Sequence, residues 1–147
     1  MTDAMTEAPG GVHHVALAVR DPAVCEAFYA SVLHLPVLRR WPAADGAAGD
    51  RSVWMDLGGG AFLALERTSA GGVAPTGRQF DTADMAGGYL MIALRIPRAA
   101  RADWEARLAA AGVAVVHRTA YTLYLADPEG NRVGLSHWPD AAPPERG

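Results

Sequence analysis

The sequence predicts an α+β fold made of two tandem strand–helix–three-strand units. Three observations predict it: two segments of alternating hydrophobicity, a helical pattern after each, and one constant spacing between the two copies. The spacing is 77 residues, and the two helices fall into register at the same offset. Such self-similarity is typical of an internal duplication. The matched strand positions are Val15 with Ile92, Leu17 with Leu94, and Val19 with Ile96.

The composition is that of an ordinary folded domain. The chain has 147 residues, of which 50% are hydrophobic and 20% charged, with a net charge of −3. Its 13 basic residues are all arginine and are scattered, which argues against nucleic-acid binding and excludes lysine Schiff-base chemistry. No apolar run reaches membrane-spanning length, and the N-terminus lacks the features of a secretory signal. We therefore expect a cytoplasmic protein with no nucleic-acid or membrane partner.

Residues 12–68 are predicted to form the first unit. Its first strand places His14 on a face of small residues and a row of larger apolar side chains on the other face. Asp21 and Pro22 mark a helix start, because Asp caps free N–H groups and Pro fits the first helical position. Helical spacing predicts a buried stripe of Val24, Phe28, Ser31, Val32 and Leu35. Three strands are expected to follow at residues 36–41, 51–57 and 61–67.

Residues 87–138 are predicted to form the second unit, after a polar, glycine-rich linker at residues 69–86. Its helix is expected to end at Gly112, as helices often end at glycine. The predicted helical stripe consists of Ala100, Trp104, Leu108 and Ala111. Strands are expected at residues 113–118, 120–126 and 131–138. Residues 139–147 are predicted to be a frayed tail.

Three stretches within the repeated unit carry a family resemblance: "HHVALAVRDP", "FYASVLHLPV" and "YLADPEGNRVGL". With them, residues 12–138 resemble the vicinal oxygen chelate superfamily, which contains glyoxalases, bleomycin-resistance proteins, fosfomycin-resistance enzymes, epimerases and extradiol dioxygenases. The resemblance implies two βαβββ modules whose curled mixed sheets pair around a cavity, with the helices outside. It also implies a homodimer, because related proteins often build the cavity across two chains.

The resemblance further implies where a divalent metal would be held. The family's ligand position on the first strand is His14, but the other three positions fall on Ala64, Met91 and Gly134. Alanine and glycine have no donor side chain, and a thioether is a soft ligand suited to copper(I). We therefore expect no metal cofactor. The alternative is a displaced divalent metal held by His14 and Glu66, since Glu66 lies two residues beyond Ala64 on the same strand face.

Strand alternation predicts which side chains line the cavity. His14 and Glu66 are the candidate acid–base residues, and His14 as a plain hydrogen-bonded wall residue is the alternative. The predicted ligand-binding positions are Ala16, Trp54, Phe62, Ala64, Met91, Ala93, Arg95, Tyr124, Gly134, Ser136 and Trp138. Ordinary core packing is the alternative for the aromatic residues, and a buried Arg95 would need a partner. His13 and His137 are expected to point away from the cavity, and Cys25 to be a buried apolar residue.

Two classes of function remain. The first is a metal-free binding protein of the bleomycin-resistance type, which holds a small, partly aromatic or apolar molecule in the cavity. It is favoured by the missing metal ligands and by the small residues that leave room for a ligand. The second is a metal-dependent lyase, isomerase or dioxygenase with a displaced metal site, or an enzyme using His14 and Glu66 as acid and base. A purely structural partner domain is a weaker third possibility.

Overall fold

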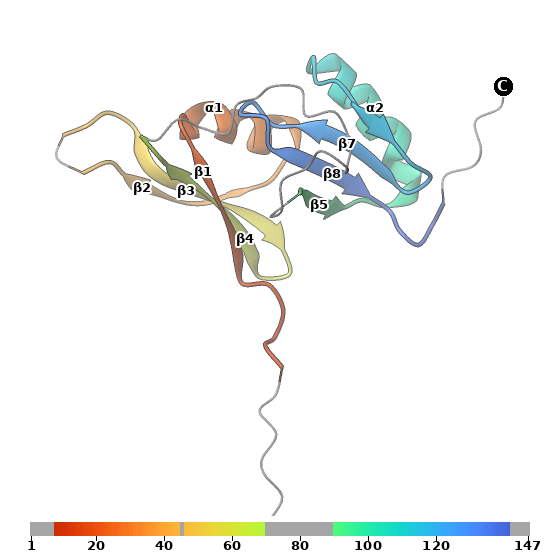
Figure 1. The fold of residues 1–147 in the computed structure, drawn as a ribbon, viewed down its shortest axis with the longest axis horizontal. Helices are drawn as coiled ribbons and strands as arrows, with labels where there is room; N and C mark the ends of the chain where they lie inside the picture. Colours follow the sequence, from red (N-terminus) through yellow and green to blue (C-terminus); the bar gives the residue numbers. More distant parts are fainter. Residues whose placement is uncertain (1–7, 45, 70–89, 142–147) are drawn as a thin grey trace, which may run out of the picture.

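Two four-stranded mixed sheets lying side by side form the protein (Figure 1). The computed structural model describes residues 8–44, 46–69 and 90–141. The first sheet, in the order β1-β4-β3-β2, contains β1 (His14–Val19), β2 (Val37–Pro42), β3 (Asp50–Gly58) and β4 (Ala61–Arg67). The second, in the order β5-β8-β7-β6, contains β5 (Ile92–Arg95), β6 (His117–Arg118), β7 (Thr122–Ala126) and β8 (Arg132–Ser136).

The two sheets have the same topology, as an internal duplication predicts. In each sheet the first strand runs parallel to the last, and the other neighbouring strands are antiparallel. Each unit also carries one helical segment between its first two strands. The predicted α+β fold of two tandem modules is therefore confirmed. The predicted linker lies, except for residue 69, outside the described residues, as does the tail beyond residue 141.

The first helix starts as predicted, but its second half is a π-helix and not the α-helix that the predicted spacing assumes. In α1 (Pro22–Glu26), the Asp21 carboxylate accepts hydrogen bonds from the backbone N–H groups of Ala23 and Val24, at 3.1 and 3.3 Å. The chain then continues as a π-helix, η1 (Ala27–Val32), whose wider turns rotate the buried face. The predicted stripe is therefore wrong at two positions, since Val24 and Ser31 are exposed. The side chains that are buried here are Cys25, Phe28, Tyr29 and Leu33.

The second helix, α2 (Arg101–Ala110), follows a short 3-10 turn, η3 (Arg98–Ala100). Leu108 is fully buried and Trp104 is half-buried, but the predicted stripe residue Ala111 is exposed because the helix has ended there. Gly112 follows with φ of 72°, a left-handed conformation that glycine adopts without strain. Among the described residues, no helix is long and apolar enough to cross a membrane.

One hydrophobic core joins the two units on the helix-covered side of the sheets. The alternation in β1 is as predicted: Val19 is fully buried and Leu17 half-buried, whereas Ala16 and Ala18 are exposed. The same division holds in β5, where Ala93 is exposed and Leu94 half-buried. The face carrying the predicted site residues is exposed at Ala16 and Ala93, and we call it the cavity-side face of each sheet.

Candidate aromatic binding face

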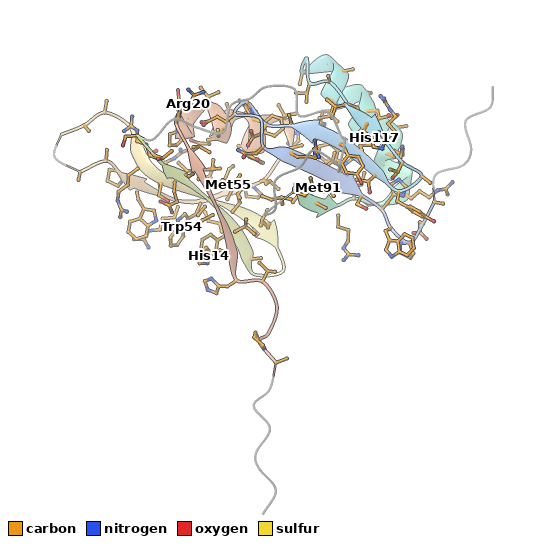
Figure 2. All side chains as sticks on the ribbon, viewed as in Figure 1. His14, Arg20, Trp54, Met55, Met91 and His117 are labelled. Carbon is orange, nitrogen blue, oxygen red and sulfur yellow. The ribbon has the colours of Figure 1, made fainter. Side chains whose placement is uncertain are left out.

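A row of four rings crosses the cavity-side face of the first sheet. His14 on β1 pairs in register with Phe62 on β4, Trp54 on β3 lies diagonally beside Phe62, and Trp41 on β2 lies beyond Trp54. Figure 2 shows His14 and Trp54 on the same side of this sheet. We call His14, Phe62, Trp54 and Trp41 the aromatic row. It spans three interstrand spacings, or about 14 Å.

The rings of the aromatic row stack on one another. The centroids of His14 and Phe62 lie 4.8 Å apart with an interplanar angle of 8°, and those of Phe62 and Trp54 lie 4.5 Å apart at 24°. Trp41 meets Trp54 edge to face at 5.3 Å. Because His14, Phe62 and Trp54 occupy each other's faces, these three rings turn their edges away from the sheet. Ring edges carry the positive part of the aromatic quadrupole.

Both ends of the row are capped by nitrogen-bearing side chains. At one end, His13 Nδ1 lies 2.9 Å from His14 Nδ1, and the His13 ring meets Phe62 edge to face. The expectation that His13 points to the opposite side is therefore wrong, because it precedes β1 and is free of strand alternation. At the other end, the Arg39 guanidinium carbon lies 3.7 Å from the Trp41 ring centroid and that of Arg51 lies 5.4 Å from it.

Trp41 is a member of the row that strand alternation does not predict. It lies at the end of a predicted strand, but the β2–β3 register shifts twice, between Val37 and Arg39 and between Trp41 and Pro42. Such irregularities change which side chains face the cavity, so simple alternation does not assign this strand. The Trp41 Nε1 atom is also buried without a hydrogen-bond partner, the one such side-chain atom in the described part of the chain.

The two candidate acid–base residues are not brought together. His14 pairs with Phe62, whereas Glu66 lies four residues further along β4, opposite Ala18. At about 3.3 Å per residue, this separates their backbones by roughly 13 Å. The Glu66 carboxylate instead accepts a 2.8 Å hydrogen bond from the hydroxyl of Ser52. His14 and Glu66 therefore form no common site in this chain.

The remaining first-sheet positions form the floor beside the row. Ala16 on β1 is in register with Ala64 on β4, and Trp54 on β3 is in register with Ala64 from the other side. Ala64 is buried at 3% exposure, and Ala16 is exposed. The methyl groups of Ala16 and Ala64 thus lie next to the row. Because they are small, the rings project further from the sheet than their neighbours do.

The cavity-side face of the second sheet is smaller and more polar. Tyr124 meets the ring of His117 at 5.4 Å, and Ser136 accepts a 2.9 Å hydrogen bond from the hydroxyl of Thr122. Ala93 lies in register with Gly134 and is exposed. Arg95 is exposed too, so it needs no buried partner, because the end of β5 is open to solvent.

Two of the family's metal-ligand positions meet on this sheet. Met91, labelled in Figure 2, holds its sulfur 3.3 Å from where a Cβ at Gly134 would stand, and Thr122 Cγ2 lies 3.2 Å from the same point. The space beside Gly134 is therefore taken by a thioether and a methyl group. These residues do not fit a divalent metal, which needs nitrogen or oxygen donors. Among the described residues, no three His, Cys, Asp or Glu side chains are grouped to hold one.

Trp138 and His137 follow the end of the last strand, β8, and neither belongs to the aromatic row. Trp138 lies beyond β8, is 65% exposed, and packs edge to face on Tyr121 at 4.6 Å, so it is not part of the aromatic row. His137 points away from the cavity-side face, as expected, but is 3% exposed rather than facing solvent. Its Nε2 receives a 3.0 Å hydrogen bond from Arg101 at the start of α2, which explains its burial.

Comparisons with known proteins agree with this architecture. The crystal structure of a glyoxalase/dioxygenase from Nostoc punctiforme superposes with a TM-score of 0.72 at 21% identity, covering 95% of this chain and 100% of that one. TnmS3, an antibiotic binding protein from a Streptomyces species, gives 0.62 at 21% identity, covering 90% and 98%. The fosfomycin resistance protein FosX from Mesorhizobium loti gives 0.64 at 16% identity, covering 86% and 90%.

At these identities the structural likenesses show the fold and leave the activity open. A search of curated proteins returns no match. The model of the glyoxalase-like domain matches residues 14–136, which is most of the chain. The protein therefore belongs to the glyoxalase-like domain family within the vicinal oxygen chelate superfamily.

Proposed function

We propose that this protein binds a small, flat, partly aromatic molecule on the aromatic row without using a metal. The observation that carries the proposal is the row itself: His14, Phe62 and Trp54 stack across three strands, and Trp41 on the fourth strand meets Trp54 edge to face. A flat ligand lying across these edges presents its electron-rich face to their positive rims, the favoured T-shaped geometry. Several such contacts form at once along the row.

Burial of apolar surface supplies most of the affinity in this proposal. A fused-ring ligand that covers about 200 Å² of apolar surface gains about 5 kcal/mol, at about 25 cal/mol per Å². The costs of association reduce that gain, which gives a weak to moderate affinity for the open face. A second sheet closing over the ligand would bury more of it. We therefore propose a homodimer in which a second copy covers the open face of small and aromatic residues.

Among the residues that the structure describes, the candidate acid–base pair does not form a site for the enzyme alternative. His14 and Glu66 lie about 13 Å apart along the sheet, too far to share a metal or pass a proton directly. Met91 and Gly134 supply no donor suited to zinc, iron or magnesium. The likenesses to FosX and to the Nostoc glyoxalase/dioxygenase concern the fold, so their chemistry is not carried to this chain.

The test is a calorimetric titration of the intact chain with naphthalene-type and anthraquinone-type compounds. Trp54→Leu should weaken binding about tenfold or more, because it removes the central ring of the row. Trp104→Leu is the matched control, since Trp104 lies on α2 outside the row, and it should change the affinity less than twofold. Equal losses in both variants would contradict the proposal.

Two further outcomes bear on the alternative. A stoichiometric divalent ion in the purified protein would overturn the metal-free part of the proposal. The wild-type protein could also convert a bound compound, and His14→Ala could abolish this conversion without changing the affinity. That result would show an enzyme and would contradict the proposed binding protein.

A further inference from the structure

Two arginines stand at one end of the aromatic row. Arg39 and Arg51 place their guanidinium groups over Trp41, with the carbon atoms 3.7 and 5.4 Å from its ring centroid. Within the described part of the chain, neither guanidinium lies within ion-pair distance of a carboxylate. Arg40, between them in the sheet, behaves differently. It pairs with Glu26 and lies 3.7 Å from Asp50.

Arg40 alternates with Arg39 and Trp41 and is in register with the buried Val53, so it pairs with Glu26 on the helix-covered side of the sheet and not on the side of the row. The carboxylate on this face close to Trp41 is that of Glu66, and it accepts the hydrogen bond of Ser52. Near Trp41 the two guanidiniums therefore face one carboxylate that is already hydrogen-bonded. A second carboxylate on this face, that of Asp56, lies at the Phe62 end of the row and accepts a hydrogen bond from the Gly58 N–H. The end of the row at β2 keeps an excess of positive charge beside a large apolar surface.

From this arrangement we infer that the ligand is an aromatic acid: a flat ring system that carries a carboxylate or a similar anionic group at one edge. This inference rests on the proposed function and specifies its ligand class. The ring system lies across Phe62 and Trp54, and its acidic group lies between Arg39 and Arg51. A guanidinium fork matches a carboxylate in bidentate geometry, which fixes the direction of the ligand along the row.

The unpartnered N–H of Trp41 is an independent observation at the same place. A buried donor without an acceptor costs free energy, because it has lost its hydrogen bond to water. Because Nε1 is buried, an anionic oxygen of the ligand would accept this hydrogen bond once the side chains that cover the atom move aside. The other end of the row, where His13 and His14 are hydrogen-bonded to each other, offers no comparable pair of permanent positive charges.

The experiment compares 2-naphthoate with 2-naphthamide, which have the same ring system and similar shape but differ in charge. Calorimetry with the intact chain should show the acid binding about tenfold more tightly at low salt, or about 1.4 kcal/mol. The double variant Arg39→Gln/Arg51→Gln should lose this preference and keep its affinity for the amide. Arg107→Gln is the matched control, because Arg107 also rests on a tryptophan, Trp104, but on α2.

Each other outcome separates the two proposals. Equal binding of acid and amide by the wild-type protein would overturn the inference and leave the proposed function standing. Binding of neither compound up to millimolar concentration would overturn both. A preference that survives in the double variant but disappears in Arg95→Gln would place the acid on the second sheet and so overturn the inference. If the double variant does not fold, Arg39→Gln and Arg51→Gln should each reduce the preference for the acid over the amide about threefold. An unchanged preference in both single variants would contradict the inference.

Discussion

The hydroxyl of Tyr29, in η1 of the first unit, donates a 2.8 Å hydrogen bond to the carboxylate of Asp127 in the second. Both residues are buried, at 1% and 5% exposure. Asp127 begins the β7–β8 turn, which is closed by Gly130 in a left-handed conformation with φ of 85°. Glu129 of the same turn accepts backbone N–H hydrogen bonds from Arg20, at 2.7 and 2.8 Å, and from Asp21, at 3.0 Å. The turn therefore fastens the two units together.

Replacing Tyr29 with Phe should lower the free energy of unfolding by about 1–2 kcal/mol. The ring keeps its packing, but the buried Asp127 carboxylate loses one of its donors. Asp127 retains the amide groups of Glu129 and Asn131, so the loss is limited. Urea unfolding measures it. An unchanged midpoint of the urea transition would show that this inter-unit hydrogen bond makes no net contribution to the free energy of unfolding.

Replacing Glu129 with Ala should cost more, about 3 kcal/mol, because the N–H groups of Arg20 and Asp21 lose the buried carboxylate that accepts all three of their hydrogen bonds. Glu105→Ala is the matched control. Glu105 forms a 2.6 Å ion pair with Arg118, but both side chains are partly exposed, so less than about 1 kcal/mol is expected. Chemical unfolding of both variants tests this, and equal losses would refute the fastening role of the turn.

The stability of the protein should fall in acid through Glu129. Burial acts to raise the pKa of this carboxyl, but hydrogen bonds from Asp21, Arg20 and Cys25 outweigh it, so the pKa lies below its ordinary value of 4.5. The ionised form is therefore favoured by folding. This contribution is present above pH 4.5 and is lost as the pH falls through the folded-state pKa. Thermal unfolding between pH 3 and 6 should show a smaller acid-dependent loss in Glu129→Gln than in the wild-type protein.

A metal site should be recoverable by restoring donors at the three family positions that lack them. Ala64→Glu, Met91→His and Gly134→Glu, beside native His14, would supply two imidazoles and two carboxylates, a set suited to zinc or iron(II). Position 64 is diagonal to His14 across β1 and β4, and position 134 is diagonal to Met91 across β5 and β8. Each sheet would then present one histidine and one carboxylate. Metal titration should give one divalent ion per chain.

The expected difficulty in that variant is crowding at position 134. A side chain there meets Thr122 Cγ2 at 3.2 Å, whereas the 3.3 Å contact with the sulfur disappears when Met91 is replaced. The two substitutions on the second sheet should therefore be less destabilising together than Gly134→Glu alone. A folded triple variant that binds no metal would show that the four positions do not converge.

Much of the candidate site could be predicted from strand alternation. Trp54, Phe62 and His14 follow from it, because side chains two apart share a face of a strand whatever lies beyond the sheet. Trp41 could not be predicted in this way, since register shifts in β2 interrupt the alternation. The pairing of His14 with Glu66 failed for a related reason. The sequence shows that His14 and Glu66 lie on the same face of the sheet. It does not show how far apart they lie, because the register of β1 against β4 is set by strand pairing.

By itself, the sequence determined the duplicated topology, the capped start of the first helix and the two-faced strands. These depend on local periodicity and on short-range hydrogen bonds, which a sequence displays directly. The tertiary structure alone decided that four rings pack into one row, with two arginines at its end that pair with no carboxylate in the described part of the chain. The tertiary structure also decided that Asp127 and Glu129 accept hydrogen bonds from residues about 100 positions away. Such contacts depend on long-range packing, which no local sequence pattern encodes.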